Sequence, residues 1–134
     1  MNIRRRRRMH PACAGNPALI AWDGSDPGIE AVRAAVPLLR CAAEVVVLSV
    51  DPPSGGMPIE KIATYLSRHG VVPELVERPS DDTVAAALID HVRAIDAGFL
   101  VMGAYGSPRL AQAIFVGVTR TMLKTCPVPL LLAH

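Results

Sequence analysis

The sequence has few aromatic residues, few cysteines and no long apolar run, and each shortage excludes a class of protein. Aromatic residues make up 4% of the 134 residues, although 51% are hydrophobic. The core must therefore be built mainly from Ala, Val, Leu and Ile. No apolar run approaches the roughly 18 residues of a transmembrane helix, so we expect no membrane association. High apolar content and modest charge exclude disorder for most of the chain, and the length predicts one domain.

The three cysteines, Cys13, Cys41 and Cys126, are odd in number and lie far apart. They form no C-x-x-C pair and no cluster with histidine, so we expect neither a metal site nor a disulfide framework. Such cysteine usage is typical of a reducing compartment, and we expect a cytoplasmic protein. Cys41 and Cys126 are predicted to be small buried hydrophobic residues.

The net charge of +2 conceals an uneven distribution. The run Arg4–Arg8 supplies five of the fourteen basic residues. Residues 9–96 hold six basic and twelve acidic side chains, whereas residues 97–134 hold three basic and no acidic ones. This asymmetry predicts a preference for anions in the last third of the chain. An ordinary solvated helix face is the alternative explanation for those three basic side chains.

The basic N-terminal segment, residues 1–16, lacks the apolar stretch of a secretory signal peptide. Adjacent arginines repel one another, so we expect a disordered tail followed by a single domain over residues 17–134. A polyanion-binding tail and a natural start at Met9 are two further hypotheses. No aromatic residues alternate with the arginines, and we do not expect nucleic acid as a partner.

From residue 17 onward, short apolar runs alternate with amphipathic segments. The apolar runs predict strands over Ala18–Trp22, Val45–Val50, Val72–Glu77, Phe99–Met102 and Val128–Ala133. The intervening segments predict helices over Asp26–Arg40, Pro58–His69, Thr83–Ile95 and Gly117–Thr125. Regular alternation of strand and helix is typical of an α/β fold with a parallel sheet.

Two prolines predict the order of the strands. Pro73 and Pro129 fall in the third and fifth predicted strands, and proline cannot donate a hydrogen bond inside a sheet. We therefore expect these strands at the edges. Right-handed crossovers then predict an open parallel five-stranded sheet, order 3-2-1-4-5, with helices on both faces. Ligands of such sheets bind where the order reverses, here between the ends of the first and fourth strands, at Asp23 and Gly103.

A glycine-bearing segment connects the fourth predicted strand to the last predicted helix. Glycines allow close backbone approach to a phosphate, and N–H groups at a helix N-terminus attract anions. The candidate residues for such contacts are Gly103, Gly106, Ser107, Gly117, Val118 and Thr119. Neither a Walker A motif nor a G-x-G-x-x-G fingerprint occurs, and ordinary turn formation is the alternative.

Three motifs resemble those of universal stress protein domains. They are Ala21-Trp22-Asp23-Gly24-Ser25, Val101-Met102-Gly103-Ala104-Tyr105-Gly106, and the closing run from Gly117 to Pro129. The resemblance covers about residues 17–133. It implies a Rossmann-like fold of the adenine nucleotide alpha-hydrolase-like type and a function in the stress response.

Many members of that family bind ATP through the signature G-x2-G-x9-G-S/T. Gly103 and Gly106 match its first half, whereas Val116 and Gly117 stand where a glycine and a hydroxyl residue are expected. A β-branched side chain at a position of close phosphate approach argues against ATP. Ser107 or Thr119 would have to replace the missing hydroxyl.

The resemblance also implies that Asp23, Val50 and Met102 line the adenine and ribose side of the site. A turn or helix-capping role is the alternative for Asp23, in its Asp-Gly-Ser sequence. The family further implies a homodimer, paired through the last strand. That strand, Val128–Ala133, would be an aggregation hazard if its apolar edge stayed unpaired.

Two hypotheses about function follow. The first is a stress-response module that binds ATP, AMP or another adenine nucleotide, and the second is a dimeric interaction or regulatory module without nucleotide. The sequence shows no paired carboxylates and no Ser/His/Asp set at the loop. We therefore expect no enzyme, with slow ATP hydrolysis the one activity left open.

Overall fold

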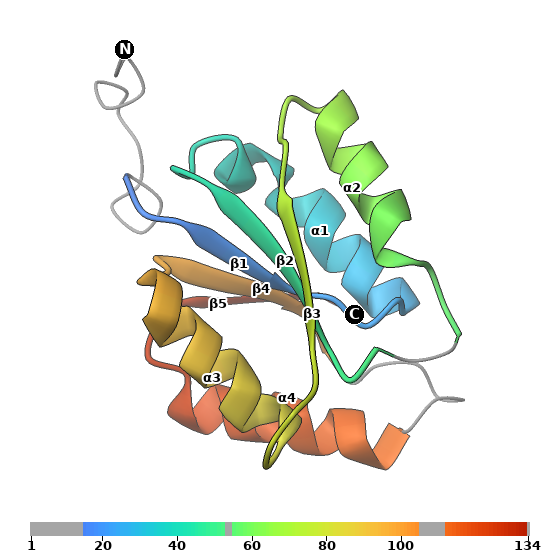
Figure 1. The fold of residues 1–134 in the computed structure, drawn as a ribbon, viewed down its shortest axis with the longest axis vertical. Coiled ribbons are helices and arrows are strands. Elements are labelled where there is room, and N and C mark those ends of the chain that lie inside the picture. Colours follow the sequence, from blue (N-terminus) through green and yellow to red (C-terminus); the bar gives the residue numbers. More distant parts are fainter. Residues whose placement is uncertain (1–14, 53–54, 105–111, 134) are drawn as a thin grey trace.

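The computed structural model describes residues 15–52, 55–104 and 112–133, and of residues 112–116 the backbone alone. Strands and helices alternate along these residues (Figure 1). The elements are β1 (Ala18–Ala21), α1 (Asp26–Leu39), β2 (Val45–Val50), α2 (Ile59–Arg68), β3 (Glu74–Arg78), α3 (Val84–Ile95), β4 (Phe99–Gly103), α4 (Gln112–Thr125) and β5 (Leu130–Ala133).

All five strands belong to one parallel sheet with the order β3-β2-β1-β4-β5. This confirms the predicted α/β class and the strand order 3-2-1-4-5. Helices α1 and α2 cover one face of the sheet, and α3 and α4 cover the other (Figure 1). Because both faces are covered, β4 is buried along its whole length and β2 along all but its last residue.

Alternate residues of each strand build two separate cores. Ile20, Val47 and Val101 are fully buried on the α1–α2 face. On the opposite face, Leu19, Leu48 and Leu100 are buried against α3 and α4. Successive side chains of a strand point to opposite sides, so an unbroken aliphatic run supplies both cores. This is why so few aromatic residues suffice.

The edge strands begin later than the sequence predicted. β3 begins at Glu74 and β5 at Leu130, so Pro73 and Pro129 precede their strands instead of lying within them. The Pro129 carbonyl still accepts a hydrogen bond from the Leu100 amide at 3.0 Å. The inference from proline to edge position is confirmed, because both strands lie at the edges of the sheet.

Helix α4 begins at Gln112, so the predicted start at Gly117 was wrong. Gly117 to Thr119 lie in the second turn and not at the helix N-terminus. Val118 and Met122, four residues apart, are buried in the core on this face. Such packing outweighs the cost of a glycine within a helix, about 1 kcal/mol.

The folded domain includes Asn16, whose carbonyl accepts a hydrogen bond from the Ala43 amide at 3.1 Å. The arginine run Arg4–Arg8 and Cys13 lie outside the described residues. Cys41 and Cys126 are free thiols and are half-buried, a shallower position than the one predicted. Within the described ranges, no helix is long and apolar enough to cross a membrane.

Candidate functional site

The carboxyl end of β4 lies directly against the beginning of α1. A Cβ atom at Gly103 would come within 2.6 Å of the Pro27 carbonyl carbon and would also overlap the Gly28 backbone. Real Cβ atoms do not approach main-chain atoms so closely, so only glycine fits. Gly103 thereby lets β4 end beside the loop that follows β1, which forms the switch point of the sheet.

Asp23 lies in that loop, and one of its oxygens holds the turn. Its Oδ1 accepts hydrogen bonds from the Ser25 amide at 3.1 Å and the Ser25 hydroxyl at 2.7 Å. The Ser25 Oγ in turn accepts a hydrogen bond from the Gly28 amide at 3.2 Å and caps α1. Both hydrogen bonds from Ser25 to Asp23 end on Oδ1.

Burial raises the pKa of the Asp23 carboxyl above its usual value of 3.8, although the hydrogen bonds from Ser25 oppose this effect. Water solvates a carboxylate better than this apolar surrounding does, and the charged form is therefore disfavoured. A hydrogen-bond donor from a ligand would stabilise the charged carboxylate in place of the water that burial removes.

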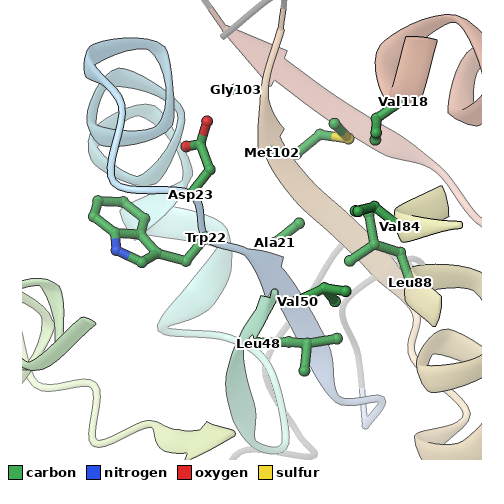
Figure 2. A pocket seen from close by; sticks show the side chains of 10 residues that line it. All are labelled: Ala21, Trp22, Asp23, Leu48, Val50, Val84, Leu88, Met102, Gly103 and Val118. Atoms are coloured by element: carbon green, nitrogen blue, oxygen red, sulfur yellow. The ribbon is translucent and has the colours of Figure 1, made fainter. Parts of the chain in front are cut away.

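A pocket opens between the ends of β1 and β4 on the α3–α4 face of the sheet (Figure 2). Five residues proposed from the sequence line it together: Asp23, Val50, Met102, Gly103 and Val118. The pocket has a cavity volume of about 30 Å³, room for a water molecule or two. A larger ligand would occupy its open mouth.

Five further lining residues were missed: Ala21, Trp22, Leu48, Val84 and Leu88. Ala21 and Leu48 follow from strand alternation once the face of Val50 is known. Val84 and Leu88 come from α3, and the chain alone did not reveal which helix covers the pocket. Together with Met102 and Val118 they make its walls apolar (Figure 2).

The other proposed residues do not line this pocket in the described part of the chain. Gly106 and Ser107 lie outside the described residues. Gly117 is exposed, and a Cβ atom there would meet nothing within 4 Å. Thr119 is fully buried, so its hydroxyl does not face solvent or a ligand.

The chemistry of the pocket suits a flat, largely apolar ring with a hydrogen-bond donor. Aliphatic side chains supply the walls, and Asp23 supplies an acceptor at the mouth. Its described lining contains no Lys, Arg or His. The described surface therefore fits the base of a nucleotide better than its phosphates.

No protein-family model matches this chain, and no curated protein matches it. Solved structures do match. Universal stress protein UspA from Lactobacillus plantarum has a TM-score of 0.70 at 12% identity, with 89% of this chain and 97% of that chain covered. A universal stress protein from Archaeoglobus fulgidus has a TM-score of 0.66 at 22% identity, with 89% and 98% covered.

A further neighbour is a universal stress protein in complex with cAMP. Its TM-score is 0.60 at 20% identity, and the match covers 89% of this chain and 97% of that one. A universal stress protein from Archaeoglobus fulgidus in complex with dAMP also matches, with a TM-score of 0.65 at 19% identity. Because all these identities are below 25%, the matches establish a similar fold and nothing beyond it.

Proposed function

We propose that this chain, which has the fold of universal stress proteins, belongs to that family and binds an adenine nucleotide in the pocket between β1 and β4. The observation that carries the proposal is the convergence of Asp23, Val50, Met102, Gly103 and Val118 on one pocket. They come from separate parts of the chain, and each was a candidate from the sequence, through the switch-point rule, the glycine-bearing segment or the family resemblance. The cAMP and dAMP complexes of its structural neighbours support the same ligand class.

Adenosine monophosphates are the favoured ligands, with ATP second. The residues proposed to contact base and ribose line the pocket, whereas Val116 and Gly117 depart from the phosphate-binding signature. Thr119 is fully buried and does not replace the missing hydroxyl as it stands. A cytoplasmic role in the stress response and the absence of catalysis, beyond slow hydrolysis, complete the proposal.

Calorimetric titration of the purified protein with AMP, cAMP, ADP and ATP tests the proposal, together with analysis of any nucleotide that copurifies. We expect saturable binding with AMP or cAMP tighter than ATP. Val50→Phe fills the pocket and should abolish the heat signal. The matched control is Val72→Phe, at a position that is 85% exposed. No binding of any adenine nucleotide at millimolar concentration would refute the proposal.

A double substitution tests the objection to ATP. Val116→Gly with Gly117→Ser restores the signature, and a Cβ atom at position 117 meets nothing within 4 Å. We expect ATP affinity to rise, because glycine admits the phosphates and the hydroxyl donates to them. Unchanged affinity would mean that the signature positions do not limit ATP binding.

The second candidate is a dimeric interaction module without nucleotide, and it rests on β5. Each residue of this edge strand, Leu130–Ala133, is only half-buried, although all four are apolar. A second copy pairing along β5 would cover them and satisfy the open edge. Sedimentation velocity measures this directly: we expect a homodimer, and a monomer across the micromolar range would refute it.

A further inference from the structure

A second cavity lies at the same edge of the sheet, on the face covered by α1 and α2. It has a cavity volume of about 190 Å³, against about 30 Å³ for the nucleotide pocket. The buried Trp22 and Ser49 and the exposed Glu77 form its floor, and Met57, Ile59 and the exposed Glu60 line its side toward α2. None of these residues except Trp22 belongs to the first pocket.

The floor is a row of three side chains across three neighbouring strands. Ser49 of β2 is the register partner of Glu77 of β3. Ala21, the last residue of β1, is the register partner of Leu48. The next residue, Trp22, donates its amide to the Leu48 carbonyl at 2.8 Å, so the parallel pairing continues and Trp22 stands beside Ser49. Neighbouring strands lie about 4.8 Å apart, so an indole, a hydroxyl and a carboxylate stand side by side.

Ser49 is the polar residue that the fold does not use. It is 3% exposed, and it lines the cavity from a strand whose inward positions on this face are otherwise Val45 and Val47. Within the described ranges, the Ser49 hydroxyl has no hydrogen-bond partner. In the same ranges, every side-chain N or O atom that is fully shielded from solvent does have a partner, so the Ser49 oxygen is not fully shielded. The Ser49 oxygen therefore keeps some contact with solvent, and a ligand in the cavity that Ser49 lines could replace this water as its hydrogen-bond partner.

The side of the cavity is held in place by the Met57 peptide. The Trp22 Nε1 donates to the Met57 carbonyl at 3.0 Å, and the Met57 amide donates to the Gly24 carbonyl at 2.9 Å. The indole projects from β1 to the side opposite Leu48 and Val50 (Figure 2). These bonds tie the loop after β2 to the loop after β1.

The charge of the cavity is negative. Glu60 and Glu77 line it, its lining includes no cationic side chain, and neither glutamate has an ion pair within the described part of the chain. The neighbouring Arg78 points to the other face of the sheet and does not neutralise the cavity. Its charge acts there on His91, whose pKa is lowered first by burial and then by Arg78. The floor therefore offers a carboxylate and a hydroxyl to a donor, beside an aromatic ring.

We propose that this cavity binds a small organic cation, a primary amine with a short aliphatic chain. The ammonium group donates to the Glu77 carboxylate and the Ser49 hydroxyl, and the aliphatic part packs on Trp22 and Ile59. An amine is charged at neutral pH, since its pKa is near that of lysine, about 10.4. An indole beside the cation adds attraction through its π face. The site does not depend on nucleotide binding in the other pocket.

Trp22 is the single tryptophan of the chain, so its fluorescence reports on the cavity. The probes are n-butylamine and putrescine, compared with butan-1-ol, butyrate and Mg²⁺ at equal ionic strength. We expect the amines to change the fluorescence saturably with a dissociation constant of about 1 mM or tighter, a realistic limit for so small a ligand. Equal binding of butan-1-ol, butyrate or Mg²⁺, or no saturation with either amine, would overturn the proposal.

Variants locate the binding. Glu77→Gln keeps the shape and removes the charge, and Ser49→Ala removes the hydroxyl; each should weaken amine binding about fivefold. The matched control is Glu74→Gln on the same strand, because its register partner Val46 belongs to the other face. Val50→Phe should block nucleotide and leave amine binding unchanged. Equal amine affinity in Glu77→Gln and the wild type would overturn the proposal, with circular dichroism confirming that each variant is folded.

Discussion

The two cavities at the carboxyl edge of the sheet differ in chemistry although both are lined by β2 and by Trp22. On the α3–α4 face, Ala21, Leu48 and Val50 make an apolar pocket with a carboxylate at its mouth. On the α1–α2 face, Trp22 and Ser49 border a larger and acidic cavity. Because side chains alternate along a strand, consecutive residues of the same strands provide both surfaces. One sheet edge therefore presents two surfaces of different chemistry.

The loop between the cavities is unfavourable for anions. The Asp23 carboxylate accepts a hydrogen bond from the amide of Ser25, the N-cap of α1, and the Ser25 hydroxyl oxygen accepts one from the Gly28 amide in the first turn. A helix N-terminus attracts phosphate only while its amides are free. The half-buried Asp23 carboxylate adds a negative charge there, so the beginning of α1 disfavours an anion.

The largest effect is expected from Gly103→Ala at the rim of the nucleotide pocket. The new Cβ would overlap the backbone of Pro27 and Gly28, which cannot rotate away. We expect a loss of about 3 kcal/mol in the free energy of unfolding, measured by urea denaturation. The control, Gly117→Ala, is an exposed helical position with open space and should gain up to about 1 kcal/mol. Similar values for both variants would contradict the close packing of β4 against α1.

The corresponding change at the amine cavity is Gly56→Ala. Gly56 has φ of +85°, and its Cβ would lie 2.6 Å from the Gly24 carbonyl oxygen. We expect a loss of about 2 kcal/mol and weaker amine binding, because the Met57 peptide would shift. The adjacent Gly55→Ala meets nothing within 4 Å and should be close to neutral. If Gly56→Ala impaired nucleotide binding more than amine binding, the two cavities would not be separate.

The smallest effect on stability is expected from Asp23→Asn, which keeps an acceptor for Ser25 and removes the charge. Burial raises the Asp23 pKa, so the folded protein binds this proton more tightly than the unfolded chain. Wild-type stability should therefore fall as pH rises from about 3.8 through the folded-state pKa. The variant lacks this component and should be slightly more stable at pH 7, as urea denaturation between pH 3.5 and 7 would show.

The same variant should bind adenosine monophosphates about tenfold more weakly, because a charged acceptor is lost. If the Asp23→Asn variant is more stable than the wild type but binds the ligand more weakly, the carboxylate serves ligand binding at a cost in stability. Lower stability at pH 7 would instead mean that the hydrogen bonds from Ser25 outweigh the cost of burial.

Much of the fold could be predicted because local chemistry and topology agree. Aliphatic runs predicted the strands, and Pro73 and Pro129 predicted the edges although they lie just outside the strands. The start of α4 could not be read from Gly117, since the packing of Val118 and Met122 decides where that helix continues. Boundaries of this kind depend on tertiary contacts that the sequence pattern does not contain.

About half of the residues that line the pocket between β1 and β4 could be predicted from the sequence. Asp23 and Gly103 follow from the switch-point rule, Val118 from the glycine-bearing segment, and Val50 and Met102 were proposed through the resemblance. Val84 and Leu88 depend on how α3 lies over the sheet, and no residue in α3 signals that position. The pairing of Ser49 with Glu77 was missed because register between distant strands is set by packing.

By itself, the sequence determined the α/β class and the strand order, and it predicted Asp23 and Gly103 at the switch point of the sheet. Hydrophobic periodicity and the restrictions on proline act locally, so a linear reading captures them. Only the tertiary structure decided that two cavities of opposite character share one edge, and that Ser49 stands buried beside Glu77. Those facts arise from residues far apart in the chain, which the register of a close-packed sheet brings together.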